Sequence, residues 1–216
     1  MTMRHGLCAL FLLASCATAQ SDDRSFRDRV LTSRASPEIA LEIDAAFAPL
    51  PVQRFPIETM TNAERRVYVE AGADRVVRRM IVVQFERAQD GSDFRFRYPS
   101  RPPRQYGENT YRFGAYVYDD ASAAQREPTR EASLTRALLI AQGYAPPRLW
   151  RASRLARVTD PDGLTEIIIF YFENADADYP AGPLQGADED GDLVLDAEAR
   201  EALARRMEAA IRPLRG

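Results

Sequence analysis

An arginine- and tyrosine-rich stretch, residues 94–118, contains the side chains best suited to binding an anionic or sugar-like ligand. Guanidinium groups bind phosphate and carboxylate in a planar geometry, and tyrosine rings stack on bases or sugars. If the stretch forms adjacent antiparallel strands, its arginines line one solvent-exposed face. The alternative is a wet sheet face on which arginine stems cover apolar strands. The residues expected to form this ligand site are Arg95, Arg97, Arg112, Tyr111 and Tyr116.

A second cluster, residues 186–199, is rich in carboxylates and resembles a calcium-binding loop over this segment alone. The acids at the first, third, fifth and ninth loop positions are Asp188, Asp190, Asp192 and Asp196. The pattern departs from calcium loops at two positions, because Leu193 replaces the glycine and Ala199 replaces the bidentate glutamate. The alternative is a turn-rich loop followed by a helix that Asp196 caps. Calcium is the only cofactor that the sequence suggests.

A third group of residues has the chemistry for acid–base catalysis. Glu166 and Glu173 bracket an apolar segment, and Asp119 and Asp120 end another, so that two carboxylates can converge at one end of a sheet. No nucleophile elbow or glycine-rich phosphate loop accompanies them in the sequence. A periplasmic carboxylate-based enzyme is therefore an alternative to a binding protein.

Most other catalytic residue types are missing from the mature part of the chain. The only histidine is His5, the only cysteines are Cys8 and Cys16, and lysine does not occur. Serine–histidine and cysteine–histidine nucleophiles, zinc sites and Schiff-base catalysis all need these residues. We therefore expect a non-catalytic binding or structural role.

The composition and net charge limit the kinds of partner that the protein is expected to bind. Of the 216 residues, 45% are hydrophobic and 28% charged, which is ordinary for one globular domain. Loss of residues 1–19 removes Arg4 and no acid, so the net charge of −3 becomes more negative by one. A mildly acidic protein shows no nucleic-acid signature. The expected partner is an envelope glycan or an anionic lipid.

Residues 1–19 have the pattern of a bacterial export signal. A short basic start with Arg4 precedes an apolar run from Leu7 to Ala14, and small residues follow. The run is too short to span a bilayer as a helix, which takes ~20 residues. The segment is therefore expected to be cleaved, after residue 15 or after residue 19.

The two possible cleavage sites imply different locations for the mature protein. Residues 13–16, Leu-Ala-Ser-Cys, resemble the lipobox of bacterial lipoproteins, which implies that Cys16 becomes a lipidated N-terminus. Ala17 after the cysteine then suits sorting to the outer membrane, with the domain facing the periplasm. Residues 17–19, Ala-Thr-Ala before Gln20, instead fit a signal peptidase site that releases a soluble periplasmic protein.

The elements expected to position these residues form one α+β domain over residues 36–216, preceded by a polar tether at 20–35. Hydrophobic periodicity and turn residues predict helices over 36–47, 128–141 and 196–214. They predict strands at 67–71, 76–86, 94–98, 111–118, 149–158 and 166–172. Residues 166–172 are apolar on both faces and should be the central strand. The predicted fold is a single antiparallel sheet of about six strands with helices packed on one side.

Overall fold

The computed structural model describes residues 23–98, 101–179, 182, 184–187 and 192–214. A large antiparallel sheet consists of β4 (Ala48–Pro49), β5 (Gln53–Ile57), β6 (Thr61–Ala71), β7 (Val77–Ala88), β8 (Pro103–Tyr106), β9 (Asn109–Asp119), β10 (Leu149–Val158), β11 (Thr165–Asn174) and β12 (Asp192–Val194). Its order is β12-β9-β10-β11-β7-β6-β4, with β5 beside β6 and β8 beside β9. Hairpins join four of its neighbouring pairs, β5–β6, β6–β7, β8–β9 and β10–β11.

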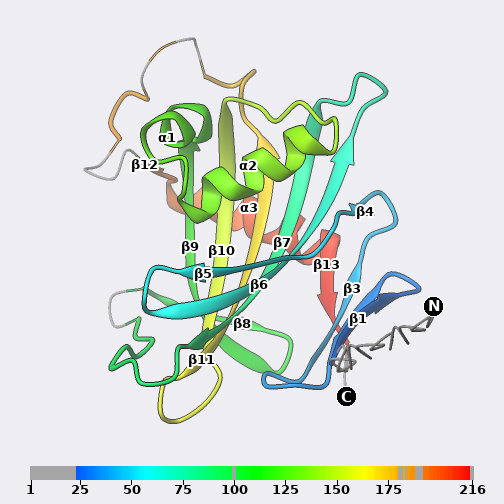
Figure 1. Cartoon of the computed structure of the whole chain (residues 1–216). Coiled ribbons are helices and arrows are strands. Elements are labelled where there is room, and N and C mark those ends of the chain that lie inside the picture. Colours follow the sequence, from blue (N-terminus) through cyan, green and yellow to red (C-terminus); the bar gives the residue numbers. More distant parts are fainter. Residues whose placement is uncertain (1–22, 99–100, 180–181, 183, 188–191, 215–216) are drawn as a thin grey trace, which may run out of the picture.

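A smaller antiparallel sheet and three helices complete the fold. The small sheet has the order β1 (Arg24–Arg27), β2 (Val30–Ser33), β3 (Ile39–Ile43) and β13 (Ile211–Pro213). Helices α1 (Asp120–Arg126) and α2 (Glu131–Ala141) lie over one face of the large sheet, and α3 (Ala197–Ala210) lies behind the opposite face (Figure 1). No helix within the described ranges is long and apolar enough to cross a membrane.

The predicted α+β fold with one six-stranded sheet is wrong, because the described residues are mostly β and form 13 strands in sheets of four and nine. The additional strands are short or rich in polar residues and proline, so their periodicity is weak in the sequence. The predicted helix over 36–47 is one of these cases. Its central part is β3, in which Leu41 and Ile43 alternate inward and are fully buried.

The N-terminal polar segment also takes on structure. Residues 24–33, expected to lie within a polar tether, form the hairpin of β1 and β2. The hairpin turns at Asp28 and Arg29, which have φ values of 49° and 66°. Leu31 is fully buried in the main core, so the hairpin is part of the domain.

The long strands and helix α2 were predicted correctly, whereas the helix expected over 196–214 ends at Ala210 and continues into strand β13. The expected strands at 67–71, 76–86, 111–118, 149–158 and 166–172 are confirmed as parts of β6, β7, β9, β10 and β11, and β11 is central. The expected strand at 94–98 is wrong. Phe96 instead packs in a loop, where its N–H donates to the Gly163 carbonyl over 2.9 Å.

Helix ends follow the expected capping chemistry. Helix α2 is confirmed within the predicted range, and Gly143 follows it at a φ of 75°, a conformation that glycine adopts without strain. The Asp196 carboxylate accepts the Ala199 N–H at the start of α3. These residues mark the end of α2 and the start of α3.

Side chains alternate along each strand, so the large sheet has two faces. Both faces carry buried apolar side chains and both are covered. On one face, α3 and the small sheet cover Ile81, Val83, Ile167 and Ile169. The other face, which we call the cavity face, lies beneath α2 and includes Met80, Val82, Trp150 and Phe172. The helices therefore do not pack on one side only.

Candidate functional site

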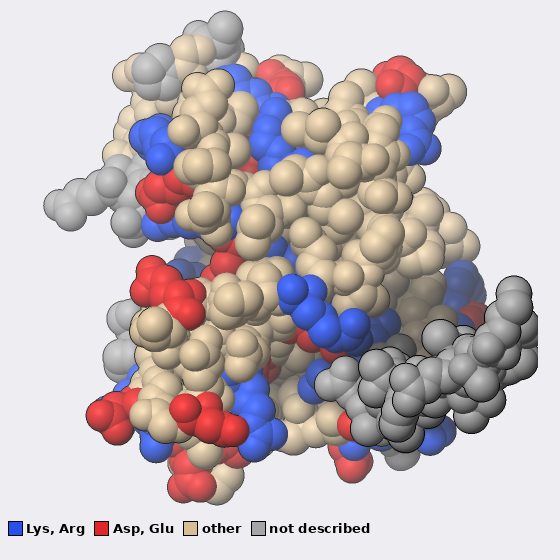
Figure 2. All heavy atoms as spheres, viewed as in Figure 1, with Lys and Arg blue, Asp and Glu red and all other residues tan. Residues whose placement is uncertain are grey.

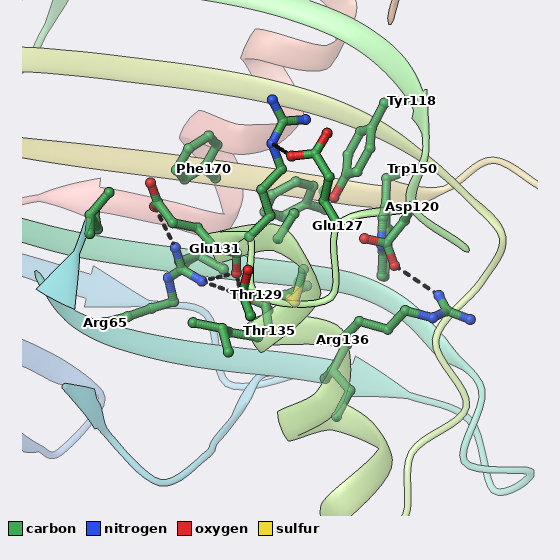
Figure 3. A pocket seen from close by; sticks show the side chains of 18 of the residues that line it. Arg65, Tyr118, Asp120, Glu127, Thr129, Glu131, Thr135, Arg136, Trp150 and Phe170 are labelled. Carbon is green, nitrogen blue, oxygen red and sulfur yellow. Dashed lines mark hydrogen bonds and ion pairs between the residues drawn. The ribbon is translucent and has the colours of Figure 1, made fainter. Parts of the chain in front are cut away.

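A cavity of about 560 Å³ lies between α2 and the cavity face of the large sheet (Figure 3). Its volume falls within the range of small-molecule sites, ~300–1,000 Å³. Five aromatic side chains from β9, β10 and β11 line it on the sheet side. We call them the aromatic floor: Tyr116, Tyr118, Trp150, Phe170 and Phe172.

Strand register explains why the floor is hollow. Ala152 of β10 lies directly between Tyr116 of β9 and Phe172 of β11. One step along the strands, Arg154 lies between Gly114 and Phe170. Ala152 and Gly114 therefore separate the rings of the floor from one another along and across the strands.

Helix α2 forms the roof of the cavity, and Arg65 of β6 holds this helix against the sheet. Its Nη1 donates to the Glu131 carbonyl and to Thr135 Oγ1, each over 2.5 Å, and its Nη2 donates to Glu131 Oε2 over 2.8 Å. Its Nε donates to Gln84 Oε1 over 2.6 Å. Burial lowers the pKa of Arg65, and the charge of Glu131 raises it. The buried guanidinium thus joins α2 to two strands of the sheet.

A second ion pair closes the other side of the roof. Arg136 of α2 donates to Asp120 Oδ2 over 2.8 Å and to the Pro147 carbonyl over 2.8 Å. Burial raises the pKa of Asp120, and the hydrogen bond from Arg136 lowers it. Both ion pairs are visible in Figure 3. Arg65 and Arg136 therefore already have protein partners, which leaves the aromatic floor as the main contact surface for a ligand.

Two carboxyl groups meet further along the same face. Glu86 of β7 and Glu166 of β11 are directly opposite each other in the strand register and are 8% and 2% exposed. The pKa of Glu166 is raised to about 8: burial is the main cause, the hydrogen bond from Tyr98 lowers the pKa, and the Glu86 charge raises it. Burial also raises the pKa of Glu86. A pKa of about 8 favours the protonated form of Glu166 at neutral pH.

Neighbouring side chains satisfy this carboxyl pair. Tyr98 Oη donates to Glu166 Oε2 over 2.5 Å, and Arg154 Nη2 donates to the same hydroxyl over 2.9 Å. Glu86 accepts from Thr61 Oγ1 over 3.0 Å and from Gln84 Nε2 over 2.5 Å. The pair can store a proton, but its small exposure leaves little access for a substrate.

The carboxylates expected to converge with Glu166 lie elsewhere. Glu173 sits at the other end of β11, where it accepts from Arg206 Nε over 2.6 Å and from Arg206 Nη2 over 2.9 Å. Asp119 caps α1 through the Ser122 N–H, and Asp120 pairs with Arg136. The sequence thus indicated one member of the buried pair and missed its partner, Glu86.

The five residues of the expected arginine–tyrosine site do not share one face. Tyr116 belongs to the aromatic floor, and Arg112 lies on the same side of β9. Tyr111 points to the opposite side, where it is 2% exposed. Arg95 and Arg97 are exposed in the loop before β8. On the face with α1 and α2, arginines and acids are interspersed (Figure 2).

The expected calcium ligands are only partly described. Asp188 and Asp190 lie outside the described residues. Asp192 is in β12 and lines the cavity, and Asp196 caps α3. Among the residues that the structure describes, no group of three or more histidine, cysteine or acidic side chains could hold a metal ion. Cys16 also lies outside the described residues.

The sequence contained a usable signal for the residues that were missed. Arg65, Gln84, Glu86 and Arg154 are polar side chains inside long strands, on the alternating positions of the cavity face. A polar residue on the buried face of a strand needs a partner, so several of them on neighbouring strands indicate a site.

Comparisons with family models, curated proteins and solved structures give no match to this chain.

Proposed function

We propose that this chain is an exported bacterial envelope protein, anchored by lipid at Cys16, that binds a small amphipathic molecule without chemically changing it. The ligand lies between α2 and the aromatic floor. The domain faces the periplasm from the outer membrane, or is soluble in the periplasm if the chain is cut before Gln20. The observation that supports binding is the cavity of about 560 Å³ with its floor of five aromatic rings.

The chemistry of the cavity favours a ligand with a large apolar part. Aromatic side chains offer broad apolar surfaces, and burial of apolar area stabilises a complex by roughly 25 cal/mol per Å². A glycan needs many hydrogen-bonding partners for its hydroxyls. Arg65 and Arg136 instead donate to Glu131, Thr135, Asp120 and backbone carbonyls. Of the two expected partner classes, an envelope lipid therefore fits better than a glycan.

The structure gives less support to catalysis. A general acid must reach the reacting group of a substrate. Glu166 and Glu86 are 2% and 8% exposed, and each already accepts hydrogen bonds from protein side chains. Burial is the largest cause of the raised pKa values of these two carboxyl groups, so a catalytic role is not needed to explain them.

Trp150 provides a direct test of the proposal. It is the only tryptophan in the chain, it is 1% exposed, and it lines the cavity. Its emission should therefore change when a ligand enters. We expect a saturable fluorescence change on titration with single-chain amphiphiles such as dodecan-1-ol or dodecyl phosphate below their micellar concentrations, with calorimetry as an independent measure.

A pair of variants on α2 locates the binding. Ala132 lines the cavity, whereas Ala137 on the same helix is exposed to solvent. Ala132→Phe should fill part of the space and weaken binding about tenfold or more, which corresponds to ~1.4 kcal/mol. Ala137→Phe is the matched control and should bind as the parent protein does. Equal affinities of the two variants would place the ligand outside the cavity.

A further inference from the structure

Two arginines without acidic partners border the aromatic floor at one end. Arg154 of β10 lies directly opposite Phe170, with its Cζ 5.8 Å from the centre of that ring. Its guanidinium donates to Tyr98 Oη, and its Cζ is 4.9 Å from the centre of the Tyr98 ring. Burial raises the pKa values of Glu86 and Glu166 and the Arg154 charge lowers them, but neither carboxyl group forms an ion pair with Arg154.

Arg101 reaches the same place from the loop before β8. A Cβ atom added to Gly114 would lie 2.5 Å from Arg101 Nη1, so the guanidinium fills the space that a side chain would take. Gly114 is the direct cross-strand neighbour of Arg154. Directly opposed residues have Cβ positions about 5 Å apart, so Arg101 Nη1 lies on the cavity face beside the strand position of Arg154.

Both cations also lie near the edge of the floor. Burial raises the pKa of Tyr116 to about 12, while the charges of Arg154 and Arg101 lower it. Tyr116 lines the cavity, and so does Asp192, whose charge has the opposite effect on Tyr116. Within the described part of the chain, no ion pair involves Arg101 or Arg154, whereas Arg65, Arg136 and Arg148 each have an acidic partner.

We propose that Arg101 and Arg154 bind the anionic head group of the ligand, a phosphate or a carboxylate, while its apolar chain lies on Tyr116, Phe170 and Phe172. Two arginines on the same face, on the same side of the floor, concentrate positive charge, and an anion bound within reach of both is stabilised by both charges. Planar guanidinium groups suit both head groups. This inference rests on the proposed function and adds the class of ligand, a single-chain anionic amphiphile.

The test compares two probes of equal chain length, dodecyl phosphate and dodecan-1-ol, with inorganic phosphate as a third. We expect the parent protein to bind dodecyl phosphate about tenfold or more tighter than dodecan-1-ol, since hydrogen bonds to charged groups are the stronger ones. Arg101→Gln and Arg154→Gln should each reduce this preference about tenfold and leave the affinity for dodecan-1-ol unchanged. Arg97→Gln, in the exposed part of the same loop, is the matched control.

A charge-preserving variant protects the test against misfolding of the arginine variants. Gly114→Ala places a methyl group where the Arg101 guanidinium lies and should reduce the preference for dodecyl phosphate without changing the net charge. Equal binding of both amphiphiles by the parent protein would overturn the head-group assignment and leave the proposed function standing. A preference that persists in both glutamine variants would also overturn it. Binding of inorganic phosphate with no amphiphile bound would contradict the amphipathic ligand, and binding of no probe would contradict the proposed function itself.

Discussion

Glu166 has an ionisable side chain that the fold keeps neutral at physiological pH. The sequence identified it as a candidate catalytic acid because it ends an apolar segment. Its behaviour depends on Glu86, on Tyr98 and on burial, and these depend on strand pairing. Residues distant in sequence meet only through the register of β7 and β11, which a single sequence does not specify. The residue type was therefore predictable and its role was not.

The protonated Glu166 predicts how stability depends on pH. The folded protein retains a proton up to a pKa of about 8, whereas the unfolded chain releases it near the ordinary value of 4.5. The free energy of unfolding should therefore be highest near the lower value and fall as the pH rises to 8, by about 4 kcal/mol from this group. Urea unfolding of Glu166→Gln should show a flatter profile across this range than the parent protein.

Glu173 lies on the same strand and serves as a control, because its pKa is shifted in the opposite direction. Burial raises its pKa, but the hydrogen bond and charge of Arg206 prevail, so its pKa lies below the ordinary value. Its contribution to stability is present above the unfolded pKa and is lost as the pH falls. Glu173→Gln should therefore leave the decline between pH 5 and pH 8 intact, within roughly 0.5 kcal/mol. A Glu166→Gln profile as steep as that of Glu173→Gln would contradict the assigned proton.

Long strands and capped helices were predictable because their signals are local. Strands β6, β7, β9, β10 and β11 alternate or are apolar over ten residues or more, and turn residues separate several of them. The small sheet was not predictable. Its strand β3 pairs with β13 from the other end of the chain, and its members have only three to five residues. Such pairings follow from tertiary packing rather than from local propensity.

Arg65 should determine whether α2 stays on the sheet. Arg65→Met keeps much of the side-chain volume but removes the hydrogen bonds to Gln84, Glu131 and Thr135. Loss of one partner in a buried polar network typically costs about 2–4 kcal/mol. Hydrogen exchange of the α2 amides should accelerate relative to that of β11. Arg78→Met, at an exposed position of β7, is the control, and equal protection of α2 in both variants would assign the helix to apolar packing instead.

At the scale of the whole molecule, the described domain starts soon after the proposed export signal. The structure is described from Asp23, and β1 begins at Arg24, so a chain lipidated at Cys16 has a short connection between the lipid and the first strand. A fully extended residue spans at most ~3.6 Å, which keeps the domain near the membrane surface. An envelope lipid would thus be close to the proposed cavity.

Labelling tests the anchor directly. Cells that produce the protein and take up a fatty-acid probe should show a labelled band, and Cys16→Ser should abolish the label. Ala19→Ser, which keeps a small residue at the second cleavage site, should retain it. A mature N-terminus at Gln20 would contradict the lipid anchor and favour the soluble periplasmic form, without affecting the binding proposal.

The roof of the cavity lies between two strands that are already neighbours. Strand β9 ends at Asp119 opposite Leu149 of β10, so a short turn would suffice to connect them. The chain instead makes an excursion through α1 and α2 before it returns to the same place. The sheet does not need this excursion for its own connectivity. Related proteins could therefore exchange or remodel the excursion as a cassette, acquiring new ligand preferences while the floor beneath it is inherited unchanged.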